Sequence, residues 1–394
     1  MIDLPAIQNA LRQQGLDGWL LADFRGTNPL ARRVLKFPPS GHSTRRYFYA
    51  IPAEGEPRKL VHRIEPGALD HLPGSKQVYL AWQELEAGVK GLLSGMQRVA
   101  MEYSPRNAIP YIAKVDAGTI ELVRSFGVEV ISSGDLVQQF EATWDDEQWS
   151  LHQEAERGTT AAYAKVWAFI AAEVGRRGEV GECEVQKVIM DHFASLGLVT
   201  DHPPIVGANG HAGDPHYEPR QPDTMIREGD LVLVDLWAKR DRPRAVYSDL
   251  TRMGFVGREV PERFAKLFAI VAEARDAAIH LLRSASASGR RLQGWEVDHA
   301  CRAVIEAAGY GPKFCHRTGH SIGQETHGNG ANIDDLETHE ERSLLPRTCF
   351  SIEPGIYLDD CGFRSEVNVY IDAKGEVHVT GGPVQQRIVA ILGE

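Results

Sequence analysis

The chain has 394 residues, of which 43% are hydrophobic and 25% are charged, and this ordinary globular composition argues against a disordered protein. Its 54 acidic residues outnumber its 43 basic ones and give a formal net charge of −11, which argues against a nucleic-acid partner because phosphate binding needs a basic surface. The length favours two domains. No apolar run reaches the roughly 18 residues of a membrane-spanning helix, so we expect no membrane partner either.

The N-terminus and the cysteines indicate where the protein resides. Residues 1–5 lack the basic and apolar stretches of a signal peptide. Five cysteines, an odd number, stand at positions 183, 301, 315, 349 and 361, and no two of them have CxxC spacing. Free thiols are typical of a reducing compartment, so we predict a cytoplasmic protein with unpaired cysteines.

The first part of the chain alternates helical and strand-like segments, which is the pattern of an α/β domain. An amphipathic pattern predicts a helix at 6–15, and apolar runs predict strands at 18–21, 46–52, 99–103 and 128–131. We find no catalytic constellation in this part. The pattern changes after a Ser-Ser-Gly break at 132–134, and we divide the chain into domains 1–142 and 143–394.

The second part has longer helices and predicts an α+β domain. Helices are expected at 145–172, 183–196, 261–284 and 295–308, and the first has three acids in its opening turn, where they suit the helix dipole. A loop rich in glycine, proline and histidine spans 202–222. Strands are expected at 231–235 and 245–255, and the C-terminal stretch is mostly strand and turn.

Five potential metal ligands stand near strands or turns of the second part. The first is an aspartate after the apolar run 231–234, where an unpaired buried charge would be costly. A polar turn near 239–244 would let two strands bring it close to a second aspartate. The five ligands are Asp235, Asp249, His320, Glu353 and Glu366. Four carboxylates and one imidazole would neutralise two divalent cations, and they suit Mn²⁺, Co²⁺ or Zn²⁺.

The order and contexts of these residues resemble the pita-bread metallopeptidase family, which includes methionine aminopeptidases, Xaa-Pro aminopeptidases and Xaa-Pro dipeptidases. The matching motifs are Ser-Asp-x-Thr-Arg around Asp249, Gly-His-x-Ile-Gly around His320, Glu-Pro-Gly at Glu353 and Arg-x-Glu at Glu366. The resemblance covers residues 143–394 and implies a pita-bread catalytic domain with a two-metal site. Residues 1–142 resemble the N-terminal domain of the creatinase and proline-peptidase branch.

The resemblance also implies catalytic residues beside the metals. His216, in Pro-His-Tyr, matches a histidine near the substrate carbonyl, and His316 and His327 match the family's His-rich stretch. Such histidines can donate to a developing oxyanion and relay protons near neutral pH; an alternative is that His316 only orients its neighbours. Glu353 matches the general base or proton shuttle, and Arg364 of the Arg-x-Glu motif completes the predicted catalytic set.

One departure from the family pattern concerns substrate specificity. The family usually has glycine two residues after the first aspartate, where this chain has Trp237, and the segment that follows carries Lys239, Arg240, Arg242 and Arg244. One interpretation is a solvated hairpin tip. The other is that this hairpin closes the pocket and that its arginines bind the substrate carboxylate, because a guanidinium group can bind it through two hydrogen bonds.

The resemblance favours an Xaa-Pro dipeptidase (prolidase), which would use two divalent ions, with Mn²⁺ as first choice, to cleave the bond before a C-terminal proline. The short chain favours this enzyme over an Xaa-Pro aminopeptidase acting on longer peptides. A second alternative is an inactive pita-bread binding protein. The presence of all five ligands argues against this alternative. The expected partners are a small peptide with proline in second position and, by family likeness, a second copy in a homodimer.

Overall fold

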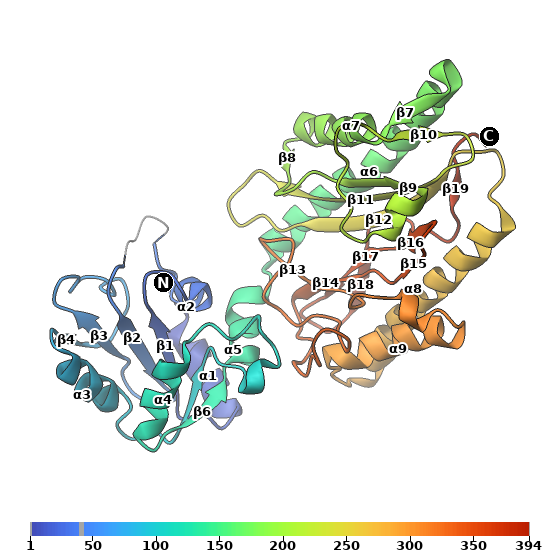
Figure 1. Ribbon diagram of the computed structural model, residues 1–394. Helices are drawn as coiled ribbons and strands as arrows, with labels where there is room; N and C mark the ends of the chain where they lie inside the picture. Colours follow the sequence, from blue (N-terminus) through green and yellow to red (C-terminus); the bar gives the residue numbers. More distant parts are fainter. Residues whose placement is uncertain (1, 39–42, 394) are drawn as a thin grey trace. The chain divides into compact units, whose positions relative to one another are not determined.

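The chain folds into two compact units, Met1–Ala142 and Thr143–Glu394, and the computed structural model describes residues 2–38 and 43–393. Figure 1 shows the course of the chain through both units. Each unit has its own hydrophobic clusters, as expected of a domain. All five cysteines are free, as predicted. Within the described ranges, no helix combines the length and the apolar character needed to cross a membrane.

Unit 1, as we call Met1–Ala142, is built on a six-stranded mixed sheet with the strand order β4-β3-β2-β1-β5-β6. The strands are β1 (Gly18–Asp23), β2 (Tyr47–Pro52), β3 (Arg58–His62), β4 (Ser75–Tyr79), β5 (Arg98–Met101) and β6 (Glu129–Ser132). β1 pairs antiparallel with β2 and parallel with β5. Every residue of β1 and β2 is buried, which explains why their apolar sequences predict them.

Helices cover both faces of this sheet. They are α1 (Leu4–Gln13), α2 (Pro29–Val34), α3 (Trp82–Leu92), α4 (Ala117–Ser125) and α5 (Gly134–Val137). Alternate side chains of a strand point to opposite faces, so Trp19 and Leu21 pack with α1 and α2, whereas Leu20 and Ala22 pack with α3 and α4. Unit 1 therefore has the predicted α/β architecture.

The outer strands β3 and β4 and the helices α3 and α4 were not predicted from the sequence. β4 lies at the edge of the sheet, and four of its five residues are exposed. Its sequence Ser-Lys-Gln-Val-Tyr therefore lacks the apolar alternation that identifies a half-buried strand. Polar side chains are common on edge strands because they discourage pairing with another chain.

Unit 2 (Thr143–Glu394) contains two largely antiparallel sheets. The first has the order β19-β12-β11-β8, with β9 also paired to β11, and the second has the order β13-β14-β17-β18. Two short pairs, β10-β7 and β15-β16, accompany them. The strands are β7 (Glu179–Gly181), β8 (Leu198–Val199), β9 (Ile205–Ala208), β10 (Met225–Arg227), β11 (Leu231–Arg240), β12 (Ser248–Phe255), β13 (Ser321–Ile322), β14 (Thr348–Ile352), β15 (Gly355–Tyr357), β16 (Gly362–Arg364), β17 (Val367–Ile371), β18 (Val377–Thr380) and β19 (Val389–Ala390).

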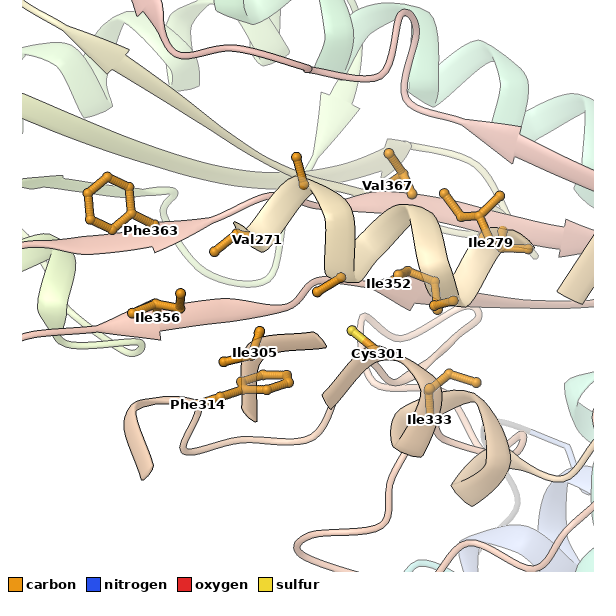
Figure 2. Packing of buried hydrophobic residues seen from close by; sticks show 14 of the residues in the cluster. Val271, Ile279, Cys301, Ile305, Phe314, Ile333, Ile352, Ile356, Phe363 and Val367 are labelled. Carbon is orange, nitrogen blue, oxygen red and sulfur yellow. The ribbon is translucent and has the colours of Figure 1, made fainter. Parts of the chain in front are cut away.

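Four long helices pack against these sheets, as the α+β prediction requires. They are α6 (Asp146–Arg177), α7 (Glu182–Ser195), α8 (Glu262–Ser288) and α9 (Gly294–Ala307). α6 and α7 bury apolar side chains against β11 and β12. α8 and α9 share a second cluster with β14, β16 and β17, where Figure 2 shows Val271 of α8, Ile305 of α9 and Phe363 of β16.

The element boundaries differ from the predicted ones for local reasons. α6 begins at Asp146 because Asp145 is its N-cap, and it continues to Arg177, beyond the predicted end, until Gly178 with φ of 86° stops it. The segment 202–222 is not only a loop, since it contains β9 and a 3-10 helix, Asn209–Gly213. β11 continues to Arg240 instead of ending at 235, which moves the hairpin turn to 241–247.

We expect Ile305→Ala in α9 to lower the free energy of unfolding by about 2–5 kcal/mol, because truncation of this fully buried side chain leaves a cavity. Leu336→Ala is the matched control, since Leu336 is 49% exposed and its truncation removes little buried surface. Chemical denaturation of both variants measures the difference. Equal losses would contradict the packing of α9 described above.

Candidate active site

The hairpin of β11 and β12 carries the two aspartates of the predicted ligand set. Asp235 pairs with Thr251, and Trp237 pairs with Asp249, in an antiparallel register. Because side chains alternate along a strand, these four side chains lie on the same face of the hairpin. Both aspartates are buried. The hairpin therefore presents Asp235 and Asp249 on one surface.

The second sheet of unit 2 supplies the other three side chains. Glu353 directly follows β14, Glu366 directly precedes β17, and His320 directly precedes β13. Backbone hydrogen bonds hold these segments together: the Ser351 N–H donates to His320 O at 2.9 Å, and the Glu353 N–H donates to Thr318 O at 2.8 Å. Since β14 runs antiparallel to both neighbours, all three side chains lie at the same end of the sheet.

The five side chains converge on one pocket of about 570 Å³. His320 Nε2 lies 3.4 Å from Asp249 Oδ2 and 3.4 Å from Glu353 Oε1. Asp249, His320 and Glu366 each offer a ligand atom, and these atoms all lie within 4.8 Å of one another. Asp235 lines the same pocket. The structure thus brings together every residue of the predicted ligand set.

Burial and mutual repulsion raise the pKa of three of the four clustered carboxylates, whereas His320, His316 and Arg364 lower the pKa of Glu353. Burial, followed by repulsion from neighbouring carboxylates, raises the pKa of Asp235 and Glu366. Burial also raises the pKa of Asp249, although the hydrogen bond from His320 opposes it. Asp235 Oδ1 is buried and has no hydrogen-bond partner among the described residues, and such an orphaned oxygen costs about 1–3 kcal/mol. This oxygen-rich set with an unused ligand atom fits divalent cations.

Arg364 is buried and connects the carboxylates to a hydrogen-bond network. Its Nη2 donates to Asp235 Oδ2 at 2.5 Å, its Nε to Thr251 Oγ1 at 3.0 Å, and its Nη1 to the Tyr357 hydroxyl at 3.0 Å. The Tyr357 hydroxyl also lies 2.7 Å from His316 Nε2. Burial lowers the pKa of His316 to about 4. A neutral His316 therefore holds Tyr357, which in turn holds Arg364.

The other two predicted histidines line the same pocket. His216 and His327 are both exposed. The His327 ring lies 4.4 Å from the His320 ring in an edge-to-face arrangement, and the charge of His320 lowers the pKa of His327 to about 3. The predicted catalytic side chains that line this pocket are Glu353, His216, His316, His327 and Arg364.

The basic segment after Trp237 does not close the pocket, so the predicted carboxylate anchor there is wrong. Arg240 pairs with Glu154 at 3.3 Å. Arg244 is exposed and pairs with Asp145, and Arg242 is exposed as well. The reason is the length of β11, which carries these side chains past the pocket to the end of the hairpin.

Lys239 is also turned away from the pocket. Its Nζ donates to Gln324 O at 2.5 Å and lies 4.7 Å from the centre of the Tyr247 ring. Two arginines do line the pocket, Arg317 and Arg364. Among the residues at 237–244 that depart from the family pattern, only Trp237 lines the pocket.

Glu182, a fully buried residue in the first turn of α7, was not predicted from the sequence to support the site. Its carboxylate accepts hydrogen bonds from the Ala208 N–H at 2.8 Å, His211 Nδ1 at 3.0 Å and the Tyr217 hydroxyl at 2.6 Å. It therefore anchors the segment that carries His216. In sequence, Glu182 looks like an ordinary acid at a helix N-terminus, so no local signal distinguishes it. Tyr357 was missed for the same reason, because its role depends on contacts with distant residues.

Comparison with known proteins agrees with this geometry. Residues 150–373 match metallopeptidase family M24. A probable dipeptidase PepE of Mycobacterium bovis is 26% identical over 348 residues, which is 86% of this chain and 85% of that protein.

Solved structures show the same fold over nearly the whole chain. Dipeptidase PepE from Mycobacterium ulcerans superposes with a TM-score of 0.69 at 22% identity, over 98% of this chain and 96% of that one. The Xaa-Pro dipeptidase from Bacillus anthracis superposes with a TM-score of 0.62 at 21% identity, over 98% of each chain. The predicted fold class, an α/β N-terminal domain followed by an α+β pita-bread domain, is confirmed.

We expect Gly319→Ala to disturb the site, because a Cβ at position 319 would lie 1.9 Å from Ser351 O. Either β14 or the adjacent His320 must then move, and the free energy of unfolding should fall by about 1–3 kcal/mol. Gly175→Ala in α6 is the control, since nothing lies within 4 Å of its added Cβ and alanine favours a helix by about 0.5–1 kcal/mol. Thermal unfolding measures both. A Gly319→Ala variant as stable as Gly175→Ala would disprove the close approach.

Proposed function

Because the chain belongs to metallopeptidase family M24, we propose that it is a metal-dependent Xaa-Pro dipeptidase. The observation that carries the proposal is one pocket in which four carboxylates and the imidazole of His320 lie beside Arg364 and four further histidines, His202, His216, His316 and His327. The names of the mycobacterial relatives support dipeptidase action. The name of the Bacillus anthracis enzyme supports a preference for proline.

Two divalent ions would be held by the five clustered side chains, Asp235, Asp249, His320, Glu353 and Glu366. The orphaned Asp235 oxygen supports this assignment because it is a ligand atom that no described residue uses, and a bound cation would offset the burial and repulsion that raise the pKa of Asp235 and Glu366. The oxygen-rich set favours Mn²⁺, with Co²⁺ or Zn²⁺ as alternatives. When bound, the ions supply positive charge that lowers the pKa of water and makes hydroxide available near neutral pH.

The side chains of this protein would perform the proton transfers. Glu353 Oε1 accepts a hydrogen bond from Ser351 Oγ at 2.9 Å, which orients the carboxylate. Glu353 would take the proton of the attacking water and pass it to the proline nitrogen as the peptide bond breaks. His216 and His327 would donate to the carbonyl oxygen as it gains negative charge.

The remaining expectations from family likeness extend this proposal. Residues 1–142 would be a creatinase-like N-terminal domain, and the chain would form a homodimer. The cytoplasmic location remains a prediction from the sequence. The competing function is that of an Xaa-Pro aminopeptidase, which differs in accepting further residues after the proline.

A substrate panel tests the proposed function. Chelator-treated protein should be inactive, and Mn²⁺ should restore hydrolysis of Ala-Pro. A dipeptidase site binds the free carboxylate of the substrate proline. A longer peptide has an amide at this position and leaves the polar groups of the site unpaired. We therefore expect kcat/KM for Ala-Pro to exceed that for Ala-Pro-Ala by at least about tenfold.

The panel also separates the alternatives. Ala-Ala is the control for proline preference, and it should be a poorer substrate than Ala-Pro. Equal cleavage of Ala-Pro-Ala would establish the aminopeptidase instead. If no peptide is cleaved with Mn²⁺, Co²⁺ or Zn²⁺, the enzymatic proposal is wrong.

Glu353→Gln should reduce kcat by about 10²–10⁴-fold, the usual contribution of general acid–base catalysis, because glutamine keeps the side-chain shape but cannot accept the proton. Glu218→Gln is the control, since Glu218 lines the same pocket but lies outside the cluster. The metal content of each variant separates loss of an ion from loss of proton transfer. Activity within a few-fold of wild type would remove Glu353 from the mechanism.

A further inference from the structure

Trp237 occupies an unusual place beside the carboxylate cluster. It lies in β11 directly opposite Asp249, and its side chain shares the hairpin face of Asp235 and Asp249. It also lines the pocket. A large aromatic ring therefore stands immediately beside the side chains proposed to hold the metals.

The indole ring is held in place from two sides. Its Nε1 donates to Asp201 Oδ1 at 2.7 Å, and Asp201 also accepts from Thr326 Oγ1 at 3.3 Å. Trp237 further packs against an apolar cluster that includes Tyr247 and Ile322. A ring fixed by both a hydrogen bond and packing cannot easily turn aside for a ligand, so it acts as a rigid wall.

Most of the residues that line the pocket are polar or charged, and Trp237 is a large aromatic residue among them. The other hydrophobic lining residues are Pro203, Ile205, Pro215 and Tyr217, and Trp237 is larger than any of them. A flat aromatic surface favours packing of a compact apolar group and offers no hydrogen-bond partner to a carboxylate. Because the ring stands beside the reacting centre, it restricts the space for one of the residues flanking the scissile bond.

We propose that Trp237 is a specificity-determining residue that limits the pocket to compact apolar substrate residues, and that Asp201 is its positioning residue. This inference rests on the proposed peptidase function and deepens it by defining the substrate class. Replacement of the ring by glycine would open space beside Asp249, and substrates with a bulkier residue or a longer chain would then be accepted.

The test compares Ala-Pro with bulkier and longer peptides, namely Leu-Pro, Phe-Pro and Ala-Pro-Ala. In the Trp237→Gly variant, kcat/KM for at least one of these three should rise about tenfold relative to Ala-Pro, mainly through KM. Trp237→Phe keeps the wall and should change the ratio by less than about threefold. Asp201→Ala frees the indole and should change the kcat/KM ratio in the same direction as Trp237→Gly, but by less. Asp201→Asn keeps the acceptor oxygen and should leave the ratio unchanged.

The controls separate this inference from the proposed function. Trp82→Ala removes a tryptophan that is 64% exposed in unit 1 and should leave all ratios unchanged. Calorimetric binding of the same peptides to metal-free protein gives a readout without turnover, in which Trp237→Gly should tighten binding of the larger peptides. Metal content and the unfolding midpoint verify that each variant is intact, and Trp237→Leu replaces the glycine variant if that one does not fold.

Two results distinguish the role of Trp237 from the proposed peptidase function. If wild type cleaves Ala-Pro but no ratio changes in an intact Trp237→Gly variant, the wall is rejected and the proposed function stands. If wild type cleaves no peptide and larger peptides still bind better to Trp237→Gly, the proposed function fails while the size restriction is supported.

Discussion

Mutual repulsion among four clustered carboxylates, three of them buried, is the constraint on which unit 2 depends. Water screens such charges poorly once they are buried, so each carboxylate needs nearby donors. The donors come from three directions: His320 lies against Asp249 and Glu353, Arg364 donates to Asp235, and Thr251 donates to Glu366 at 2.8 Å. These contacts leave one Asp235 oxygen without a partner among the described residues. A bound cation would give this oxygen a partner.

The fold holds this repulsive cluster together by joining its two sheets directly. The Asp249 N–H donates to Asn368 Oδ1 at 3.0 Å, and the Asn368 side chain donates back to Asp249 O at 2.5 Å. The Glu366 N–H donates to Thr251 O at 3.2 Å. β12 and β17 thus fix the positions of their carboxylates through backbone contacts that do not depend on the charges themselves.

Helices add a second layer of support behind the sheets. Arg302 of α9 pairs with Asp298 through two hydrogen bonds of 2.9 Å, and Asp298 accepts the Thr318 N–H, also at 2.9 Å, just before His320. In α8, the fully buried Arg275 donates to Ser365 Oγ at 2.5 Å, between Arg364 and Glu366. Buried arginines with several acceptors are costly to disturb, so the loops that carry the ligands are held rigidly.

The class of fold and the clustered side chains could be predicted from the amino-acid sequence alone. Continuous apolar runs predict β1, β2 and the start of β11, because strands buried on both faces need such runs. Asp235 could be singled out because a charged residue after an apolar run is rare without a partner, and the full ligand set could be predicted because its order and motifs resemble those of the pita-bread metallopeptidases. Only the tertiary structure decided which other residues act with them. The basic segment after Trp237 points away from the pocket because β11 is longer than its apolar run, whereas Glu182 and Tyr357 act through residues far away in sequence. Strand length and register decide which distant side chains meet, and no local pattern records either of them.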